Sequence, residues 1–289
     1  DGTVSATTDD SGATFTGLVT VDGVADDVTV SSTGTFDNKN VGVGKVVTLV
    51  ETTGGDDVGN YNITNQGTTT ADVTQKDLTI SGITASNKTY DGTVSATTDD
   101  SGATFTGLVD GDDVTVSATG TFDNKNVGVG KTVTLVETNA GDDVGNYTIT
   151  DQGTTTANIT AKTLTATASA SNKVYDGNTT ATVTLTFTGL VGDETLGQTV
   201  GATFADKNVA NAKTVTVNSI TLSDDGDSGG LADNYTISTG QTTTANITPK
   251  ALTIGGITAS NKTYNGNTTA TIDVSAATFT GLVDGDDVT

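Results

Sequence analysis

Apolar and polar residues alternate strictly along many short segments of the chain. The segment ATVTLTFTG at 181–189 places Val183, Leu185 and Phe187 on one face and threonines on the other. This two-residue period is typical of a half-buried β-strand. The same alternation occurs in other segments, namely 112–122, 131–138, 146–150 and 154–160. Gly, Asp and Asn turn signals separate these segments, and no amphipathic helical window interrupts them.

The predicted strands belong to a unit that repeats along the chain. SNKTYDG at 86–92 returns as SNKVYDG at 171–177 and as SNKTYNG at 260–266. Residues 1–19 are identical to residues 91–109. Every Phe, Tyr and Lys falls on a repeating position: Phe15/Phe105/Phe187/Phe279, Phe36/Phe122/Phe204, Tyr61/Tyr147/Tyr235, Tyr90/Tyr175/Tyr264, Lys39/Lys125/Lys207, Lys45/Lys131/Lys213, Lys76/Lys162/Lys250 and Lys88/Lys173/Lys262. This pattern predicts several small equivalent domains, each with its own core.

These repeats predict an all-β protein of tandem Ig-like antiparallel β-sandwich domains, arranged end to end as a rod. The predicted boundaries are 1–75, 76–161, 162–249 and 250–289. We expect the first repeat to lack its first strand and the fourth to be incomplete. A β-solenoid is the alternative fold, but its coils repeat about every 20–30 residues.

The composition of the chain excludes several classes of binding partner and of metal site. The 289 residues carry 35 acidic and 12 basic side chains, for a net charge of −23. This charge repels nucleic acid phosphates, so we expect no nucleic acid partner. No apolar run is long enough to cross a bilayer, so we expect no membrane insertion. The chain has no Cys, which excludes disulfides and thiolate metal sites.

The Tyr-Asp-Gly motif predicts a tight turn, since Asp-Gly and Asn-Gly favour positive φ. In the last copy, Asn265 stands at the position of Asp91 and Asp176. A catalytic acid at this position could not be replaced by an amide. We expect the Tyr90 ring to be buried with its hydroxyl on a backbone partner, or else to stack on carbohydrate. Lys39 and its copies are expected to be solvated or ion-paired. The alternative is that each forms an intramolecular Lys–Asn isopeptide bond.

Clusters of Asp are the only candidate ligands for a cofactor. Ca²⁺ prefers six to eight hard oxygen ligands, and acidic loops near domain boundaries could supply them. The candidate calcium ligands are Asp110, Asp112, Asp113, Asp142, Asp143, Asp224, Asp225 and Asp227. Solvated turns are the alternative explanation, because no cluster fits the EF-hand pattern. Apart from Ca²⁺, we expect no cofactor.

Enzymatic activity is not expected. The chain has no His or Cys, no Ser paired with a base, and no unrepeated pair of carboxylates for acid and base roles. Gly-rich phosphate loops followed by a helix are also missing.

The ordered motifs ASNKxYDG, TGLVxGDDVTVS, KNVGxGKTVT, GNYTIT and TTTAxITxK resemble the YDG domain family over essentially the whole chain. The departures are Asn265, a four-residue insertion near 21–25 and a longer loop at 223–232. The resemblance implies a tandem module of large secreted bacterial adhesins, including filamentous-haemagglutinin-like proteins.

From the repeats and the resemblance together we expect the stalk of an extracellular bacterial adhesin or surface filament. Such a stalk projects a tip or builds fibre or biofilm matrix. The alternative is a repeated glycan- or matrix-binding module. The candidate partners are copies of the chain itself and glycans.

Overall fold

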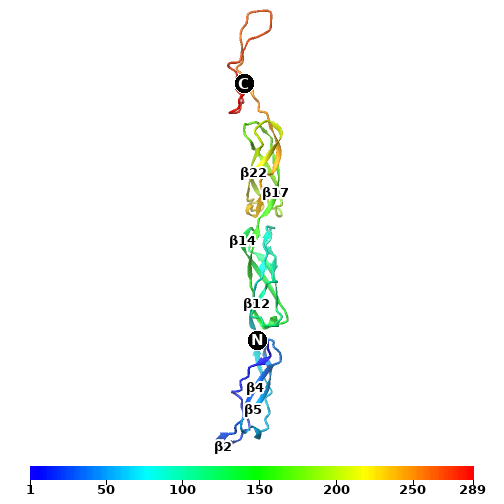
Figure 1. The fold of residues 1–289 in the computed structure, drawn as a ribbon, viewed down its shortest axis with the longest axis vertical. Coiled ribbons are helices and arrows are strands. Elements are labelled where there is room, and N and C mark those ends of the chain that lie inside the picture. Colours follow the sequence, from blue (N-terminus) through cyan, green and yellow to red (C-terminus); the bar gives the residue numbers. More distant parts are fainter. The chain divides into compact units, whose positions relative to one another are not determined.

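The computed structural model describes residues 1–289 and is all-β, as predicted (Figure 1). Three single turns of 3-10 helix are the only helical elements, and none is long or apolar enough to cross a membrane. The chain divides into two compact units. The first comprises 1–86, 94–123 and 130–157, and the second comprises 87–93, 124–129 and 158–289. The predicted repeat boundaries remain a prediction.

The first unit contains most of the strands that precede residue 157. They are β1 (Ser5–Ala6), β2 (Thr20–Val21), β3 (Val24–Ala25), β4 (Thr29–Phe36), β5 (Gly42–Gly54), β6 (Thr68–Val73), β7 (Lys76–Ser81), β8 (Thr84–Ala85), β10 (Ser95–Ala96), β11 (Thr98–Asp99), β12 (Thr104–Thr106), β13 (Thr115–Phe122), β14 (Gly128–Ala140), β15 (Tyr147–Thr150) and β16 (Thr154–Thr160). The helical turns η1 (Val58–Asn60) and η2 (Val144–Asn146) each precede a tyrosine. Strands β14 and β16 extend into residues of the second unit.

The second unit repeats this order. Its elements are β9 (Lys88–Thr89), β17 (Lys162–Ala170), β18 (Lys173–Val174), β19 (Thr180–Ala181), β20 (Val183–Thr188), β21 (Gly197–Phe204), β22 (Ala210–Ser223), η3 (Ala232–Asn234), β23 (Tyr235–Ile237), β24 (Thr242–Thr248), β25 (Thr253–Gly255), β26 (Thr258–Ala259), β27 (Ile272–Asp273) and β28 (Thr278–Thr280).

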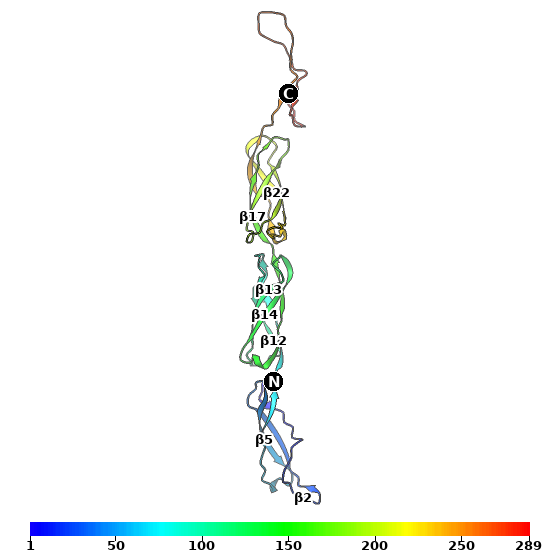
Figure 2. The same cartoon turned by 180° about the vertical axis from the view of Figure 1, so that it is seen from behind.

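A long antiparallel hairpin occurs in each of the first three repeats, as β4–β5, β13–β14 and β21–β22 (Figures 1 and 2). Near the hairpin connection the register is the same each time: the repeated Phe pairs with a Val, as in Phe122 with Val133 and Phe204 with Val215. In β21–β22 a bulge between Gly201 and Ala202 shifts the pairs beyond it. Because side chains alternate between faces, this shared register places the same apolar residues on the core side in every copy.

The segment that opens a repeat joins a second, smaller sheet. Strand β7 pairs antiparallel with β12 and parallel with β15, and β17 pairs in the same way with β20 and β23. Further along, β9 pairs parallel with β16 and β18 pairs parallel with β24. The opening segment therefore contributes to both sheets of the sandwich. Its parallel pairs differ from the purely antiparallel prediction, since the opening and closing strands run in the same direction.

Two buried clusters each draw their residues from a single repeat. One cluster contains Leu185, Phe204, Val215 and Ile247, with Phe187 packed against it. A second contains Leu78, Val114 and Tyr147. The alternating threonines of β20 are exposed while Leu185 of the same strand is buried, as the two-residue period predicts.

Candidate functional site

A turn acid sits at the same place in every repeat. In the sequence GLVxGDD and its variants, the residue three positions after Val donates its backbone N–H to that Val carbonyl. The distances are 3.1 Å for Asp112 to Val109, Glu194 to Val191 and Asp286 to Val283. Asp26 closes a longer loop onto Val19 at 3.0 Å. We call Asp26, Asp112, Glu194 and Asp286 the turn acids.

A tyrosine from the same repeat binds each of the first three turn acids. Tyr61 donates its hydroxyl to Asp26 at 2.6 Å. Tyr147 donates to Asp112 at 2.5 Å, and Tyr235 donates to Glu194 at 2.6 Å. Each hydroxyl also accepts the backbone N–H of the Val in the turn, at 2.8–3.0 Å. The preceding 3-10 turn positions the ring, because each of these tyrosines caps that turn.

A lysine from the preceding repeat reaches the same carboxylate. Lys125 Nζ lies 2.8 Å from Glu194 Oε1, and Lys207 Nζ lies 3.4 Å from Asp286 Oδ1. Lys39 contacts Asp112 in the same way and lies 3.2 Å from Asp143. These lysines lie in the connection of the long hairpin. The ion-paired alternative predicted for them is confirmed.

The tyrosine of the Tyr-Asp-Gly motif is the second ligand supplied by the preceding repeat. Tyr90 donates its hydroxyl to Glu194 at 2.6 Å, and Tyr175 donates to Asp286 at 2.9 Å. Tyr90 is 1% exposed, and its ring meets that of Tyr235 edge-on at 5.4 Å. The ring is buried as predicted, but the expectation of a backbone partner is wrong: the hydroxyl donates to a carboxylate. We call Tyr90, Lys125, Glu194 and Tyr235 the junction cluster.

An asparagine beside each cluster adds a backbone contact. Asn234 accepts the N–H of Val127 at 2.9 Å and donates to the side chain of Asn126 at 3.1 Å. Asn146 makes the same two bonds to Val41 and Asn40, at 3.0 and 3.3 Å. The Lys-Asn-Val loop of one repeat therefore docks on the Asn-Tyr pair of the next.

The remaining residues of the Tyr-Asp-Gly motif shape this contact. Asp91 accepts bonds from Lys88 and from the N–H of Thr93, forming the predicted turn. Asn265 accepts from Lys262 in the same way, which explains why the charge is dispensable. Gly92 has φ +78°, and a Cβ there would lie 2.6 Å from a methyl group of Val191. Only glycine fits this conformation and this close approach.

The charges of the junction cluster are stabilised by these partners. Burial, the largest single influence, raises the pKa of Glu194, but hydrogen bonds from Lys125, Tyr235 and Tyr90 outweigh it and hold the pKa below its usual value. Burial and the bond to Glu194 raise the pKa of Tyr235 to about 12. Hydrogen bonds from Lys39 and Tyr147 likewise lower the pKa of Asp112.

The predicted calcium ligands are mostly engaged as hydrogen-bond acceptors. Asp112 and Asp143 bind Lys39, and Asp113 accepts from the N–H of Asp142. Asp224 and Asp225 bind the N–H groups of Ala232 and Asp227, and Asp225 also accepts from Thr195. Asp110 and Asp227 are exposed. No group of three or more carboxylates is placed to hold a metal ion, so calcium binding stays a prediction without structural support.

The Lys–Asn isopeptide alternative is disfavoured by the same geometry. Amide formation requires a neutral amine and a protonated acid or an amide facing it. Lys125 faces the carboxylate of Glu194, and this hydrogen bond raises the pKa of the amine. Lys39 is held charged by its bond to Asp112. Both lysines therefore remain ammonium ions in stable ion pairs.

We predict that replacing the shared carboxylate by Glu194→Gln destabilises the second unit by about 1.5–3 kcal/mol at pH 7, the range for hydrogen bonds to a charged group. The folded-state pKa of Glu194 lies below its usual value of 4.5. Its stabilisation is therefore complete above pH 4.5 and is lost as the pH falls through the folded-state pKa. Urea unfolding between pH 7 and pH 2 should show this loss in the wild type and a flatter profile in the variant.

Asp193→Asn is the matched control for Glu194→Gln. Asp193 is the adjacent residue and is exposed. Its substitution removes the same charge without touching the cluster. Equal effects of the two substitutions would contradict the role of Glu194.

Gly92→Ala is expected to lower the protection of the Val191 turn from hydrogen exchange. The new methyl group meets Val191 and also strains a positive φ. Gly153→Ala is the control, since Gly153 has φ +73° and open space at its Cβ position. Both variants strain a positive φ, and only Gly92→Ala also clashes with Val191. Gly92→Ala should therefore lower the free energy of unfolding by about 1–3 kcal/mol more than Gly153→Ala. Equal losses at the two sites would exclude a tight contact with Val191.

The intact mass should equal the mass calculated from the sequence, because the lysines are expected to form ion pairs and not amides. Mass spectrometry of the denatured chain tests this directly. A deficit of one ammonia or one water per junction would show that a covalent bond had formed.

Comparison with protein-family models places nearly all of the chain in one family. The YDG domain model matches four times, at residues 1–71, 74–157, 160–245 and 248–289. No curated protein and no solved structure shows significant similarity to the chain. The matched segments contain the turn acids, the tyrosines and the lysines described above. The chain therefore belongs to the YDG domain family, of which it contains four repeats.

Proposed function

We propose that this chain is the stalk of an extracellular bacterial adhesin or surface filament, projecting a tip or building fibre or matrix. One observation carries the proposal. Groups from two consecutive repeats share a single turn acid, as at Glu194, which binds Lys125 and Tyr90 of one repeat and Tyr235 of the next. Equivalent contacts recur at Asp112 and Asp286.

A repeated, specific contact suits a mechanical role. The segments that join repeats, such as Ala161–Lys162, contain no flexible Gly/Ser linker. The junction cluster adds an ion pair and two tyrosine hydrogen bonds to this short connection. A series of such contacts should hold successive repeats at fixed angles. The net charge of −23 also opposes collapse of the chain on itself.

Direct glycan binding, the alternative function, has no comparable support. Stacking on a sugar requires an accessible aromatic face, whereas the rings of Tyr90 and Tyr235 are 1% and 4% exposed; among the tyrosines only Tyr264, in the fourth repeat, is largely exposed, at 93%. The hydroxyl groups of Tyr90 and Tyr235 are also committed to Glu194.

Small-angle scattering at low concentration should report an extended particle. Strand β14 has 13 residues, which at about 3.3 Å per residue gives about 43 Å. Three such repeats end to end would have a radius of gyration near 37 Å by this spacing. A compact globular chain with the same number of residues would have a radius of gyration of about 19 Å.

Glu194→Gln should make the scattering profile more typical of a flexible chain, whereas Asp193→Asn should not. A compact radius for the wild type would contradict the stalk. A glycan array on the same sample separates the two functions, since binding to glycans by a compact chain would favour the alternative.

A further inference from the structure

The opening and closing segments of a repeat lie side by side and run in the same direction. In the second repeat β9 pairs parallel with β16, and in the third β18 pairs parallel with β24. The chain enters the second repeat ahead of β9 and leaves it at the end of β16, where Thr160 is followed after one residue by β17. Tension along the chain therefore pulls the two paired segments in opposite directions along the strand axis.

Strand direction decides how this tension acts on the hydrogen bonds. In an antiparallel pair the entry and the exit of the chain would lie at the same end of the ladder, and the bonds would break one after another. In a parallel pair they lie at opposite ends of the ladder. All the bonds between the two segments are then loaded at the same time, so they resist the tension together.

Three hydrogen bonds with printed side-chain or turn geometry join these segments in the second repeat. Asn87 Oδ1 accepts the backbone N–H of Asn158 at 2.7 Å. The carbonyl of Thr160 accepts the N–H of Tyr90 at 2.8 Å, and the Thr160 hydroxyl donates to the carbonyl of Lys88 at 3.3 Å. Both partners in each bond lie on segments that tension pulls apart.

The third repeat has the same three bonds. Asn172 accepts the N–H of Asn246 at 2.7 Å. Tyr175 donates its N–H to the carbonyl of Thr248 at 2.9 Å, and the Thr248 hydroxyl donates to the carbonyl of Lys173 at 3.3 Å. This arrangement gives the asparagine of the Ser-Asn-Lys motif a role, which the junction cluster does not.

Tyr90 couples these bonds to the junction cluster. Its backbone N–H binds Thr160 of the closing strand, while its hydroxyl binds Glu194. Movement of the opening segment along the closing strand would therefore break the buried hydroxyl bond as well as the backbone bond.

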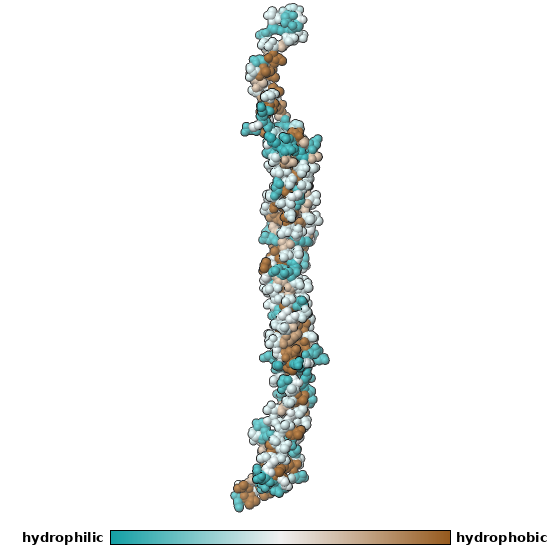
Figure 3. All heavy atoms as spheres, viewed as in Figure 1, coloured by the Kyte–Doolittle hydropathy of each residue, from teal (hydrophilic) through white to brown (hydrophobic).

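Burial does not account for the strength of this contact. Asn87 and Thr160 are exposed, and much of the surface in Figure 3 is close to white, the colour of intermediate hydropathy. Water can compete for such bonds when they open singly. Their resistance to tension depends on being loaded together.

We infer that the Ser-Asn-Lys-x-Tyr segment and the closing strand form a mechanical clamp in the second and third repeats. Asn87 and Asn172 each supply one of its bonds, and Thr160 and Thr248 supply two each. The clamp resists axial tension and keeps the repeat folded under load. Its role in the protein rests on the proposed stalk function, since a tethered stalk carries tension between its ends.

Unfolding of single molecules at constant force tests the clamp. The chain has no Cys, so a cysteine added at each end attaches it uniquely. Release of the second repeat should lengthen the chain by the extended length of residues 76–160, roughly 300 Å, less the folded length. Forced unfolding reports the unfolding rate of each repeat directly.

Asn87→Ala should speed the unfolding of the second repeat about 2- to 10-fold at constant force, because one of the bonds loaded together is lost. The third repeat should keep its rate. Asn172→Ala should have the converse effect. Asn87→Asp retains an acceptor oxygen for the N–H of Asn158 and should behave like the wild type.

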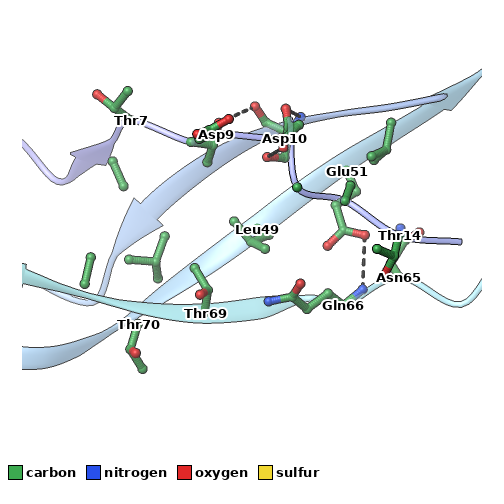
Figure 4. Close-up of a pocket in the computed structure, with 18 of the residues that line it drawn as sticks. Thr7, Asp9, Asp10, Thr14, Leu49, Glu51, Asn65, Gln66, Thr69 and Thr70 are labelled. Atoms are coloured by element: carbon green, nitrogen blue, oxygen red, sulfur yellow. Dashed lines mark hydrogen bonds between the residues drawn. The ribbon is translucent and has the colours of Figure 1, made fainter.

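Thr98→Val is the matched control in the second repeat. The Thr98 hydroxyl donates to the carbonyl of Ala118 at 2.6 Å on the edge of β13. In the first repeat Asp10 binds the equivalent edge, accepting the N–H of Ser32 at 2.9 Å (Figure 4). This edge lies between internal strands, which tension along the chain does not pull apart. Thr98→Val should lower stability in urea about as much as Asn87→Ala but leave the rate under force unchanged.

Equal acceleration by Asn87→Ala and Thr98→Val under force would overturn the clamp, since force would then act only through overall stability. An unfolding rate that Asn87→Ala does not change would overturn it too. A compact particle in solution scattering would overturn the stalk, but it would not alter the comparison of these variants under force.

Discussion

The structure depends on a carboxylate that is removed from water but kept charged. Glu194 is 8% exposed, and a buried charge is costly unless ionic and hydrogen-bonding partners replace its hydration. Lys125, Tyr90 and Tyr235 supply that replacement. Lys125 and Tyr90, which come from the preceding repeat, contribute only if the two repeats have one particular separation and angle. The cost of an unpaired Glu194 therefore selects one relative placement of the groups around it.

The strands and their faces were predictable from the sequence, whereas the junction cluster was not. Alternation in residues 181–189 correctly placed Leu185 inside and the threonines outside. Tyr90 and Glu194 are 104 residues apart, and no local pattern links them. The signal that could have linked them was present, because the positions of Lys125, Tyr90, Tyr235 and the turn acids each recur from repeat to repeat. Residues that recur without serving the core of their own repeat are candidates for contacts between repeats.

The opening segment shows how tertiary pairing overrides local preference. YTIT is a strand at 147–150 where β7 lies beside it, but the similar YNIT at 61–64 is not. Its backbone gains no ladder partner in the first repeat, so the same alternation cannot by itself produce a strand. The parallel pairs β7–β15 and β9–β16 could not be predicted from local sequence either, because each joins segments about 70 residues apart.

The order of the junction residues along the chain has an evolutionary consequence. A complete repeat contains the Tyr and Lys that contact the following repeat. It also contains the turn acid and second Tyr that contact the preceding repeat, and in the second repeat these four residues are Tyr90, Lys125, Asp112 and Tyr147. Duplication of one whole repeat therefore creates a complete new interface without any further mutation, and deletion of one removes an interface cleanly. Unequal recombination between near-identical copies can thus change the length of the array while every remaining joint stays intact.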